Sequence, residues 1–355
     1  MDPMDFDTRI VPGHAPDGAP ILSLLAKASF VLVPGSTLSR LAAIPTKLTE
    51  NDTDAESDLV AWKPLADLVL VGRAHAPRGK RAHFMDVGVA VDGRIGQVRV
   101  FGKRTVDLST GSIRFTDSEL FESMPLGSDL AYGGADALSD PESVHIYPRN
   151  PFGKGYRVFA RPETLHGLEL PCLEDPQQLL TPDTLIVGAP DRWIRQPKPR
   201  HFGCVSRASH PRFELAGLPP DAALDARIAH QKALAASPTV GAGETLPPPP
   251  KRMDPRFHNC APEFLQFPHL EGTETVKLSY MDPDFPLIEF ELPGVRPESW
   301  LDVGEGPQSM QMVLQTLEIR PDEKLVHMVW RGSCAWAGPG SGMEFTRFEH
   351  GLILG

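Results

Sequence analysis

The stretch MDVGVAVDGRIGQVRV (residues 85–100) alternates apolar with polar or small side chains on both sides of the dipeptide Asp92-Gly93. A period of two residues is typical of a strand that buries one face. Asp-Gly is a preferred sequence for a two-residue hairpin turn. Such a turn places apolar side chains opposite each other on one face, in the pairs Val87–Val98 and Met85–Val100. The stretch therefore predicts a β-hairpin with a defined register.

Further strands are expected toward both ends of the chain. In the first third, residues 66–72 (ADLVLVG) and the apolar run 21–33 predict strands. In the last third, alternating segments joined by turns that contain Pro and Asp predict two hairpins, with the strands Val276–Tyr280, Ile288–Leu292, Leu317–Ile319 and Val326–Trp330. The expected pairs in the second hairpin are Ile319–Val326 and Leu317–Met328. We expect these four strands to form one antiparallel meander with a solvated face.

The middle of the chain has a different composition. The sequence holds 37 prolines and 31 glycines, and residues 119–253 are dense in both, which favours loops and turns. One helix is predicted in this region, at Asp221–Ala236, between Pro219-Pro220 and Pro238. The four prolines at 247–250 predict a stiff, extended spacer.

These patterns predict a mainly β fold. With 355 residues and 41% hydrophobic content, the chain can bury a substantial core. We expect an antiparallel β-sandwich or open barrel with a long loop-rich central region and one or two short helices. The expected parts are a flexible N-terminus (1–20), an N-terminal β region (21–118), the loop-rich central region (119–253), and a C-terminal β meander (254–355) that packs with the N-terminal region.

Charge and cysteine content restrict the class of protein. The 35 Lys and Arg residues against 46 Asp and Glu residues give a formal net charge of -11, which disfavours nucleic acid and anionic membranes as partners. The N-terminus is acidic and does not resemble a secretory signal, and the apolar run 21–33 is too short to span a bilayer. Four widely spaced cysteines indicate reduced thiols. We therefore expect a soluble, cytoplasmic protein.

Sequence motifs of known catalytic sites are missing. The chain has no phosphate-binding P-loop, no G-x-S-x-G nucleophile motif and no H-E-x-x-H zinc motif. A trio of titratable side chains, His75, His83 and Asp86, lies near the first hairpin and could serve acid-base catalysis. We favour a structural role for His75, because His83 and Asp86 would point to opposite faces of one strand.

One combination of residues could bind zinc, since zinc prefers four nitrogen or sulfur ligands. It consists of two pairs that lie far apart in the sequence, His201 with Cys204 and His258 with Cys260. The second pair is separated by a single residue, which is unlike the usual spacing of structural zinc ligands. We predict no metal and no cofactor.

Nine short motifs occur in one order along the chain. They are VGRAHAP (71–77), RVFGKR (99–104), AYGGAD (131–136), YPRNPFGKGY (147–156), LPCLEDP (170–176), FGCVSR (202–207), DPRFHNCAPEFLQ (254–266), ELPGVRP (291–297) and TLEIRPDEKLVHMVWRGSC (316–334). This series resembles the bacterial family known as domain of unknown function 2169, over about residues 20–335. Compared with that family, the chain carries Cys260 where a small residue such as alanine is common.

The resemblance implies an accessory role in type VI secretion, because members of the family are encoded beside genes of that system. A member is expected to be a non-catalytic adaptor or chaperone. It would bind a toxic effector or its PAAR-type carrier and help to load it onto the VgrG spike. The resemblance provides no catalytic residue.

The motifs also contain residues that could bind a partner or hold the fold together. They are His75, Tyr132, Gly133, Gly134, Arg149, Asn150, Gly153, Asp254, Arg256, Phe257, Asn259 and Trp330. An alternative function is an enzyme of unknown reaction, with a site built from the loops around His75, Arg149, Asn150, Asp254, Arg256 and Asn259. A third is a structural part of the secretion machine, which would associate stably without cargo. Free polar side chains that converge would favour the enzyme, whereas side chains bonded to backbone would favour a structural role.

Overall fold

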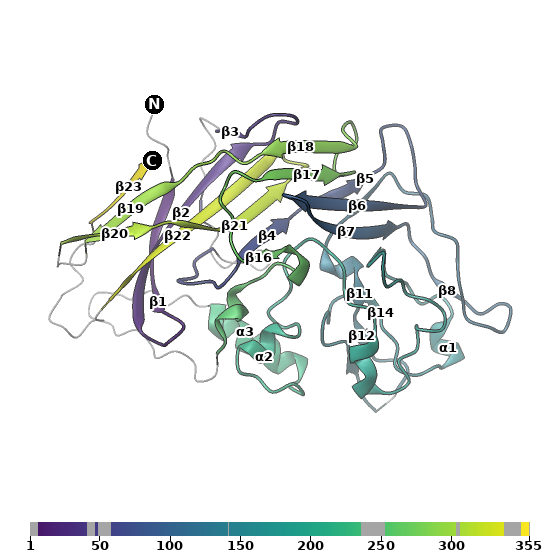
Figure 1. Cartoon of the computed structure of the whole chain (residues 1–355). Coiled ribbons are helices and arrows are strands. Elements are labelled where there is room, and N and C mark those ends of the chain that lie inside the picture. Colours follow the sequence, from purple (N-terminus) through teal and green to yellow (C-terminus); the bar gives the residue numbers. More distant parts are fainter. Residues whose placement is uncertain are drawn as a thin grey trace.

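The computed structural model describes residues 6–40, 47–48, 58–140, 142–235, 253–302, 306–336 and 349–354. Strands make up 39% of the structure and helices 11%. The sheets are mostly antiparallel, and those that the described residues form do not close into a barrel. The predicted mainly β fold is therefore confirmed (Figure 1).

The largest sheet has seven strands and combines both ends of the chain. Its order is β1-β2-β22-β21-β4-β16, and β3 also pairs with β2. The strands are β1 (Asp7–His14), β2 (Pro20–Val31), β3 (Ser39–Arg40), β4 (Ala66–Leu70), β16 (Gln266–Phe267), β21 (Val313–Arg320) and β22 (Leu325–Ala335). β4 runs parallel to β21, and the other neighbours are antiparallel.

The second sheet has five strands in the order β15-β7-β6-β17-β18. They are β6 (Phe84–Val91), β7 (Arg94–Phe101), β15 (Leu173–Glu174), β17 (Thr275–Ser279) and β18 (Leu287–Glu291). The β6–β7 hairpin has its predicted register, with Val87 opposite Val98. Asp92 and Gly93 have φ values of 45° and 86°, so the two-residue turn adopts the backbone that this dipeptide favours.

The two C-terminal hairpins lie in different sheets, so the prediction of one meander is wrong. The β17–β18 hairpin pairs with β6, whereas the β21–β22 hairpin lies between β2 and β4. The predicted pairing of Ile319 with Val326 is present in the second hairpin. Its register follows from a short turn, whereas the choice of sheet depends on strands far away in the sequence. Both sheets therefore contain strands from both ends of the chain.

The remaining strands form small sheets. They are β5 (Arg73–His75) with β10 (Ser123–Pro125), β8 (Val106–Asp107) with β9 (Arg114–Phe115), β11 (Tyr132–Gly133) with β14 (Lys154–Gly155), β12 (Ala135–Asp136) with β13 (His145–Ile146), and β19 (Pro297–Asp302) with β20 (Pro307–Gln311) and β23 (Glu349–Leu354). Two of these small sheets, β11 with β14 and β12 with β13, lie within the central region, where prolines and glycines keep strands short.

The helices of the described residues are short. They are α1 (Pro162–Leu165), α2 (Arg212–Leu215) and α3 (Leu224–Ala235), with the 3-10 turns η1 (Ser128–Leu130), η2 (Pro190–Arg195), η3 (Pro255–His258) and η4 (Glu263–Leu265). The helix predicted from Asp221 is α3, which begins three residues later. Residue 236 and the prolines 247–250 lie outside the described residues.

The two large sheets share one hydrophobic core. Buried side chains of the first sheet, such as Phe30 and Leu68, belong to the same cluster as Val89 and Leu278 of the second. The central region has a smaller core of its own around Tyr147. None of the helices in the described part of the chain is long and apolar enough to cross a membrane.

Candidate functional site

Two motif segments of the central region interlock through their backbones. Gly134 N donates to Asn150 O at 2.8 Å. The Asn150 side chain fastens the same junction, because its Nδ2 donates to Ser128 O at 2.7 Å and to Tyr132 O at 3.3 Å. Asn150 is almost fully buried. Its amide therefore serves the internal hydrogen bonding of this junction.

Three glycines allow these segments to approach so closely. A Cβ on Gly133 would lie 2.2 Å from Asn150 O, and a Cβ on Gly134 would lie 2.6 Å from Gly153 O. A Cβ on Gly153 would lie 2.4 Å from Ala131 O. Gly134 also has a φ of 104°, a conformation that residues with a Cβ disfavour. Packing and backbone conformation account for all three positions.

Tyr132 belongs to a buried aromatic cluster. Its ring centroid lies 5.1 Å from that of Tyr147 and 6.5 Å from that of Tyr156, in edge-to-face contacts. Burial raises the pKa of Tyr147 to about 12 and also raises the pKa of Tyr132 and of Tyr156. Tyr132 Oη donates to Gln196 Oε1 at 3.1 Å, and Arg149 Nη1 donates to Gln196 O at 3.2 Å. These phenols are neutral hydrogen-bonding groups, and Arg149 holds a loop against them.

Asp254, Arg256 and Phe257 lie at the short turn η3. Asp254 Oδ1 accepts a hydrogen bond from Arg256 N at 2.9 Å, and the two side chains form an ion pair at 2.7 Å. Phe257 is buried, and its carbonyl oxygen accepts hydrogen bonds from Nε and Nη2 of Arg212 at 3.0 Å and 2.8 Å. Arg212 Nη1 also donates to Val205 O at 2.6 Å. Arg212, which the sequence analysis did not name, therefore ties η3 to α2 and to the segment before α2, whereas Asp254 and Arg256 hold η3 itself.

The titratable trio near the first hairpin does not converge. His75 Nε2 lies 2.7 Å from Asp322 Oδ1, in the turn between β21 and β22. Asp86 pairs with Arg99 at 2.7 Å, on the neighbouring strand. His83 precedes β6, and its ring bonds to a backbone carbonyl. Each side chain is thus engaged with a different partner.

Trp330 is part of the core. It lies on β22 and is 2% exposed. Its ring makes an edge-to-face contact with Phe6, with 5.7 Å between the ring centroids. The position is explained by packing.

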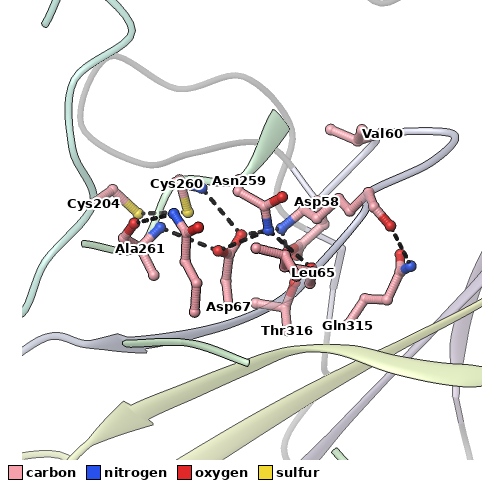
Figure 2. Close-up of polar contacts among 12 residues, drawn as sticks. Asp58, Val60, Leu65, Asp67, Cys204, Asn259, Cys260, Ala261, Gln315 and Thr316 are labelled. Carbon is pink, nitrogen blue, oxygen red and sulfur yellow. Dashed lines mark hydrogen bonds and ion pairs between the residues drawn. The ribbon is translucent and has the colours of Figure 1, made fainter. Parts of the chain in front are cut away.

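A buried polar cluster surrounds Asp67 on β4, and the sequence analysis did not predict it (Figure 2). The Asp67 carboxylate accepts hydrogen bonds from Lys63 Nζ at 2.9 Å and from Asn259 Nδ2 at 3.0 Å. It also accepts them from the backbone nitrogens of Cys260 at 3.0 Å and Ala261 at 3.3 Å. Four donors therefore replace the water that the carboxylate loses on burial. We call Lys63, Asp67, Asn259, Cys260 and Ala261 the Asp67 network.

Further buried groups extend this network. Lys63 Nζ donates to Thr316 Oγ1 on β21 at 3.1 Å, and Arg331 Nε on β22 donates to Val60 O at 2.6 Å. Burial opposes the charge of Lys63, but the contact with Asp67 raises its pKa overall. Burial lowers the pKa of Arg331 to about 10, so this side chain also stays charged near neutral pH. The result is a set of charges that joins β4 to the segment before it and to the centre of the large sheet.

One signal in the sequence pointed to this network. Asp67 is a charged residue inside the otherwise apolar strand ADLVL (66–70). A charge that is fully buried requires partners, so this position was a sign of a hydrogen-bonding site on β4 that the sequence analysis did not use. The partners could not be named, because Asn259 lies 192 residues away in the chain. Asn259 itself was among the predicted motif residues, whereas Lys63, Asp67 and Arg331 were missed.

The structure brings together one cysteine from each of the two pairs that were considered for zinc. Cys204 Sγ lies 3.1 Å from Cys260 Sγ, beside the Asp67 network (Figure 2). His201 is buried, and this burial lowers its pKa to about 4. Within the described ranges, no group of three or more His, Cys, Asp or Glu side chains is placed to hold a metal ion.

Comparison with known proteins places the chain in a family. Residues 17–331 match the family described as uncharacterized protein conserved in bacteria (DUF2169). The chain belongs to this family. The match begins before β2 and ends at Arg331, so it includes the second sheet, most of the first sheet without β1 and the last residues of β22, and the Asp67 network. No curated protein and no solved structure matches the chain.

Proposed function

We propose that this protein is a non-catalytic adaptor or chaperone of type VI secretion. It binds an effector or the PAAR-type protein that carries it, and it helps to load this cargo onto the VgrG spike. The proposal starts from the family, whose members are expected beside the genes of that system. The cargo is a protein, so the binding site is expected on an exposed surface.

The observation that carries the proposal is that the polar motif residues bind to other parts of the same chain. Asn150 and Asn259 donate to backbone carbonyls, and Arg149 does the same across a loop. The His75 ring contacts the Asp322 carboxylate, and Asp254 forms an ion pair with Arg256. These side chains lie in separate places and hold irregular backbone in position. Such contacts favour the adaptor over the enzyme that the same residues could have formed.

Exposed apolar side chains gather at one end of the two large sheets. Phe285 and Leu287 lie at the turn between β17 and β18, and Val33 and Val71 lie just after β2 and β4. With Tyr280 they are between 36% and 57% exposed. We call these five residues the apolar end surface. Large exposed apolar side chains that cluster are typical of protein-binding sites.

Hydrogen bonds between the two sheets fix the position of this surface. Leu32 N, beside Val33, donates to Lys324 O at 2.8 Å in the turn between β21 and β22. Gly35 N then donates to Glu289 O on β18 at 2.6 Å. His75 N donates to Tyr280 O at 2.8 Å, which connects the chain after β4 to the β17–β18 turn. These bonds place the chain after β2 beside β18 and the chain after β4 beside the β17–β18 turn.

Strand addition at the edge of the second sheet receives less support. The outer edge of β18 is already occupied by residues 35–38. Leu38 N donates to Glu291 O at 3.0 Å, and Glu291 N donates to Ser36 O at 3.2 Å. An occupied edge does not present free backbone groups to a partner strand. Docking through side chains is the mode that this end of the molecule favours.

The test is an affinity purification of the tagged full-length protein from its native cells. The bound proteins are identified by mass spectrometry. Recovery of a PAAR-type or VgrG-type protein together with a toxin is the expected result. A preparation without any spike protein or toxin would contradict the adaptor role, and a retained small molecule would favour the enzyme.

A further inference from the structure

The closest approach of two thiols in the described structure is that of Cys204 and Cys260, whose sulfur atoms lie 3.1 Å apart. A disulfide has a sulfur-sulfur distance of about 2.05 Å, so the two sulfurs need to approach by about 1 Å. All four cysteines, Cys172, Cys204, Cys260 and Cys334, are free thiols. We propose that Cys204 and Cys260 form an oxidation site that a peroxide converts into a disulfide.

The two thiols differ in a way that assigns their roles. Cys204 is partly exposed, whereas Cys260 is 2% exposed. The contact with Cys204 and the burial of the side chain raise the pKa of the Cys260 thiol well above its usual value. The thiolate is the form that attacks a peroxide, and access to the oxidant is required as well. Cys204 is therefore the sulfur that reacts first, and Cys260 is the resolving thiol.

The chemistry proceeds in two balanced steps. The Cys204 thiolate attacks one oxygen of hydrogen peroxide, the O–O bond breaks, and the leaving hydroxide takes up a proton to become water. Cys204 is then a sulfenic acid. The Cys260 sulfur attacks the Cys204 sulfur, a second water leaves, and the disulfide forms. In total two thiols are oxidised and one molecule of peroxide is reduced to two molecules of water.

The backbone around the pair is already held together. Val205 N donates to Cys260 O at 2.7 Å, so the segment of Cys204 lies against that of Cys260. The nitrogen of Cys260 donates to Asp67, and that of the next residue, Ala261, does the same. These contacts restrain the two sulfurs as near neighbours before oxidation. The disulfide would add a covalent link between residues that are 56 positions apart.

This inference does not depend on the proposed function. It requires only the fold, the neighbouring thiols and an oxidant. The chain is expected to be reduced in a reducing compartment and oxidised when a peroxide is present. A crosslink that closes a long loop restricts the unfolded chain, so the oxidised protein is expected to unfold at a temperature several degrees higher.

The experiment treats the folded full-length protein with a slight excess of hydrogen peroxide and blocks the remaining thiols with an alkylating agent. Peptide mass spectrometry without reduction is expected to find a Cys204–Cys260 crosslink. Two of the four thiols, Cys172 and Cys334, are expected to remain available for alkylation once the protein is denatured. Two results would overturn the proposal. In one, Cys204 is oxidised beyond the sulfenic acid while Cys260 remains a thiol; in the other, both cysteines escape oxidation and are alkylated.

Two variants separate the roles of the sulfurs. In Cys260→Ala, the sulfenic acid on Cys204 has no resolving partner, so dimedone is expected to label Cys204 far more than in the wild type. The matched control is Cys334→Ser, which removes another partly exposed thiol and is expected to form the same crosslink as the wild type. Equal dimedone labelling of Cys204 in the wild type and in Cys260→Ala would show that Cys260 does not resolve it, and would contradict the proposal.

Discussion

Lys63 Nζ lies 2.9 Å from Asp67 Oδ2, and both side chains are almost completely buried. Removing two charges from water is costly, and the ion pair alone does not always offset this cost. Here the carboxylate also accepts hydrogen bonds from Asn259, Cys260 and Ala261. The pair is therefore embedded in a network that satisfies it, and loss of one partner leaves the others buried without it.

Replacement of Asp67 by Asn is expected to destabilise the protein strongly. The change leaves the Lys63 charge buried without its anion. It also replaces one carboxylate oxygen, which accepts hydrogen bonds, by an NH2 group that faces other donors. Breaking one side of a buried pair costs about 3–5 kcal/mol. Urea unfolding followed by circular dichroism measures the free energy of unfolding of Asp67→Asn against the wild type.

The matched control is an exposed ion pair. Lys277 Nζ lies 3.1 Å from Glu289 Oε2 on neighbouring strands, with both side chains about half exposed. Exposed pairs contribute about 0–1 kcal/mol, so Glu289→Gln is expected to change stability little. If Asp67→Asn were as mild as Glu289→Gln, the Asp67 network would not stabilise the fold.

Replacement of Gly134 by Ala is also expected to be destabilising. The new Cβ would lie 2.6 Å from Gly153 O, and the φ of 104° disfavours any residue with a Cβ. Strain and overpacking of this kind cost about 2–4 kcal/mol. Thermal unfolding is expected to show a clearly lowered midpoint.

Gly203 provides the comparison for that substitution. A Cβ at Gly203 would meet nothing within 4 Å. Gly203→Ala is therefore expected to change stability by no more than about 0.5 kcal/mol. A similar loss of stability in both variants would show that the contact with Gly153 is not what restricts Gly134.

The sequence predicts structure well where the determining contacts are local. The register of the β6–β7 hairpin follows from the Asp92-Gly93 turn and the alternation around it. The assignment of β17–β18 and β21–β22 to one sheet was wrong, because the neighbours of these hairpins come from the other end of the chain. Strand pairing over such distances leaves no pattern in the hairpin itself.

The difference between local and long-range contacts also decided which residues of the candidate site could be predicted. Asn150 and Gly134 were named from their motifs, and their structural role depends on segments that are close in sequence. Lys63 and Asp67 were missed, although a charge in an apolar strand was visible. The partners of Asp67 come from the segment around Asn259, and such pairing can only be found once the fold is known.

The buried His201 predicts a dependence of stability on pH. Burial lowers its pKa to about 4 in the folded protein from the usual value of 6.5. Between these values the unfolded chain binds a proton that the folded chain does not, so stability falls as pH falls. The stability that the neutral His201 contributes is fully present above the pKa of the unfolded chain, and it decreases as pH falls toward the pKa of the folded protein. A shift of this size corresponds to about 3 kcal/mol, of which about 2 kcal/mol is lost between about pH 7.5 and about pH 5.

Urea unfolding at these two pH values tests this contribution. His201→Gln is expected to show a smaller loss of stability between them than the wild type, by about 2 kcal/mol. His269→Gln, at a half-exposed position, is the matched control and is expected to follow the wild type. An unchanged pH dependence in His201→Gln would show that His201 is not the responsible group.

The apolar end surface makes the last prediction, which concerns binding. Leu287 is 57% exposed at the start of β18, and Ile95 is 64% exposed on β7, which is separated from β18 by β17 and β6 in the same sheet. Both residues lie on strands and are similarly exposed, so Leu287→Asp and Ile95→Asp are expected to keep the fold. A charge within a docking surface must be desolvated on binding, which weakens association at least tenfold when about 2 kcal/mol is lost. Leu287→Asp is therefore expected to lose the spike protein or effector in affinity purification while Ile95→Asp retains it, and equal recovery with both variants would move the binding site elsewhere on the molecule.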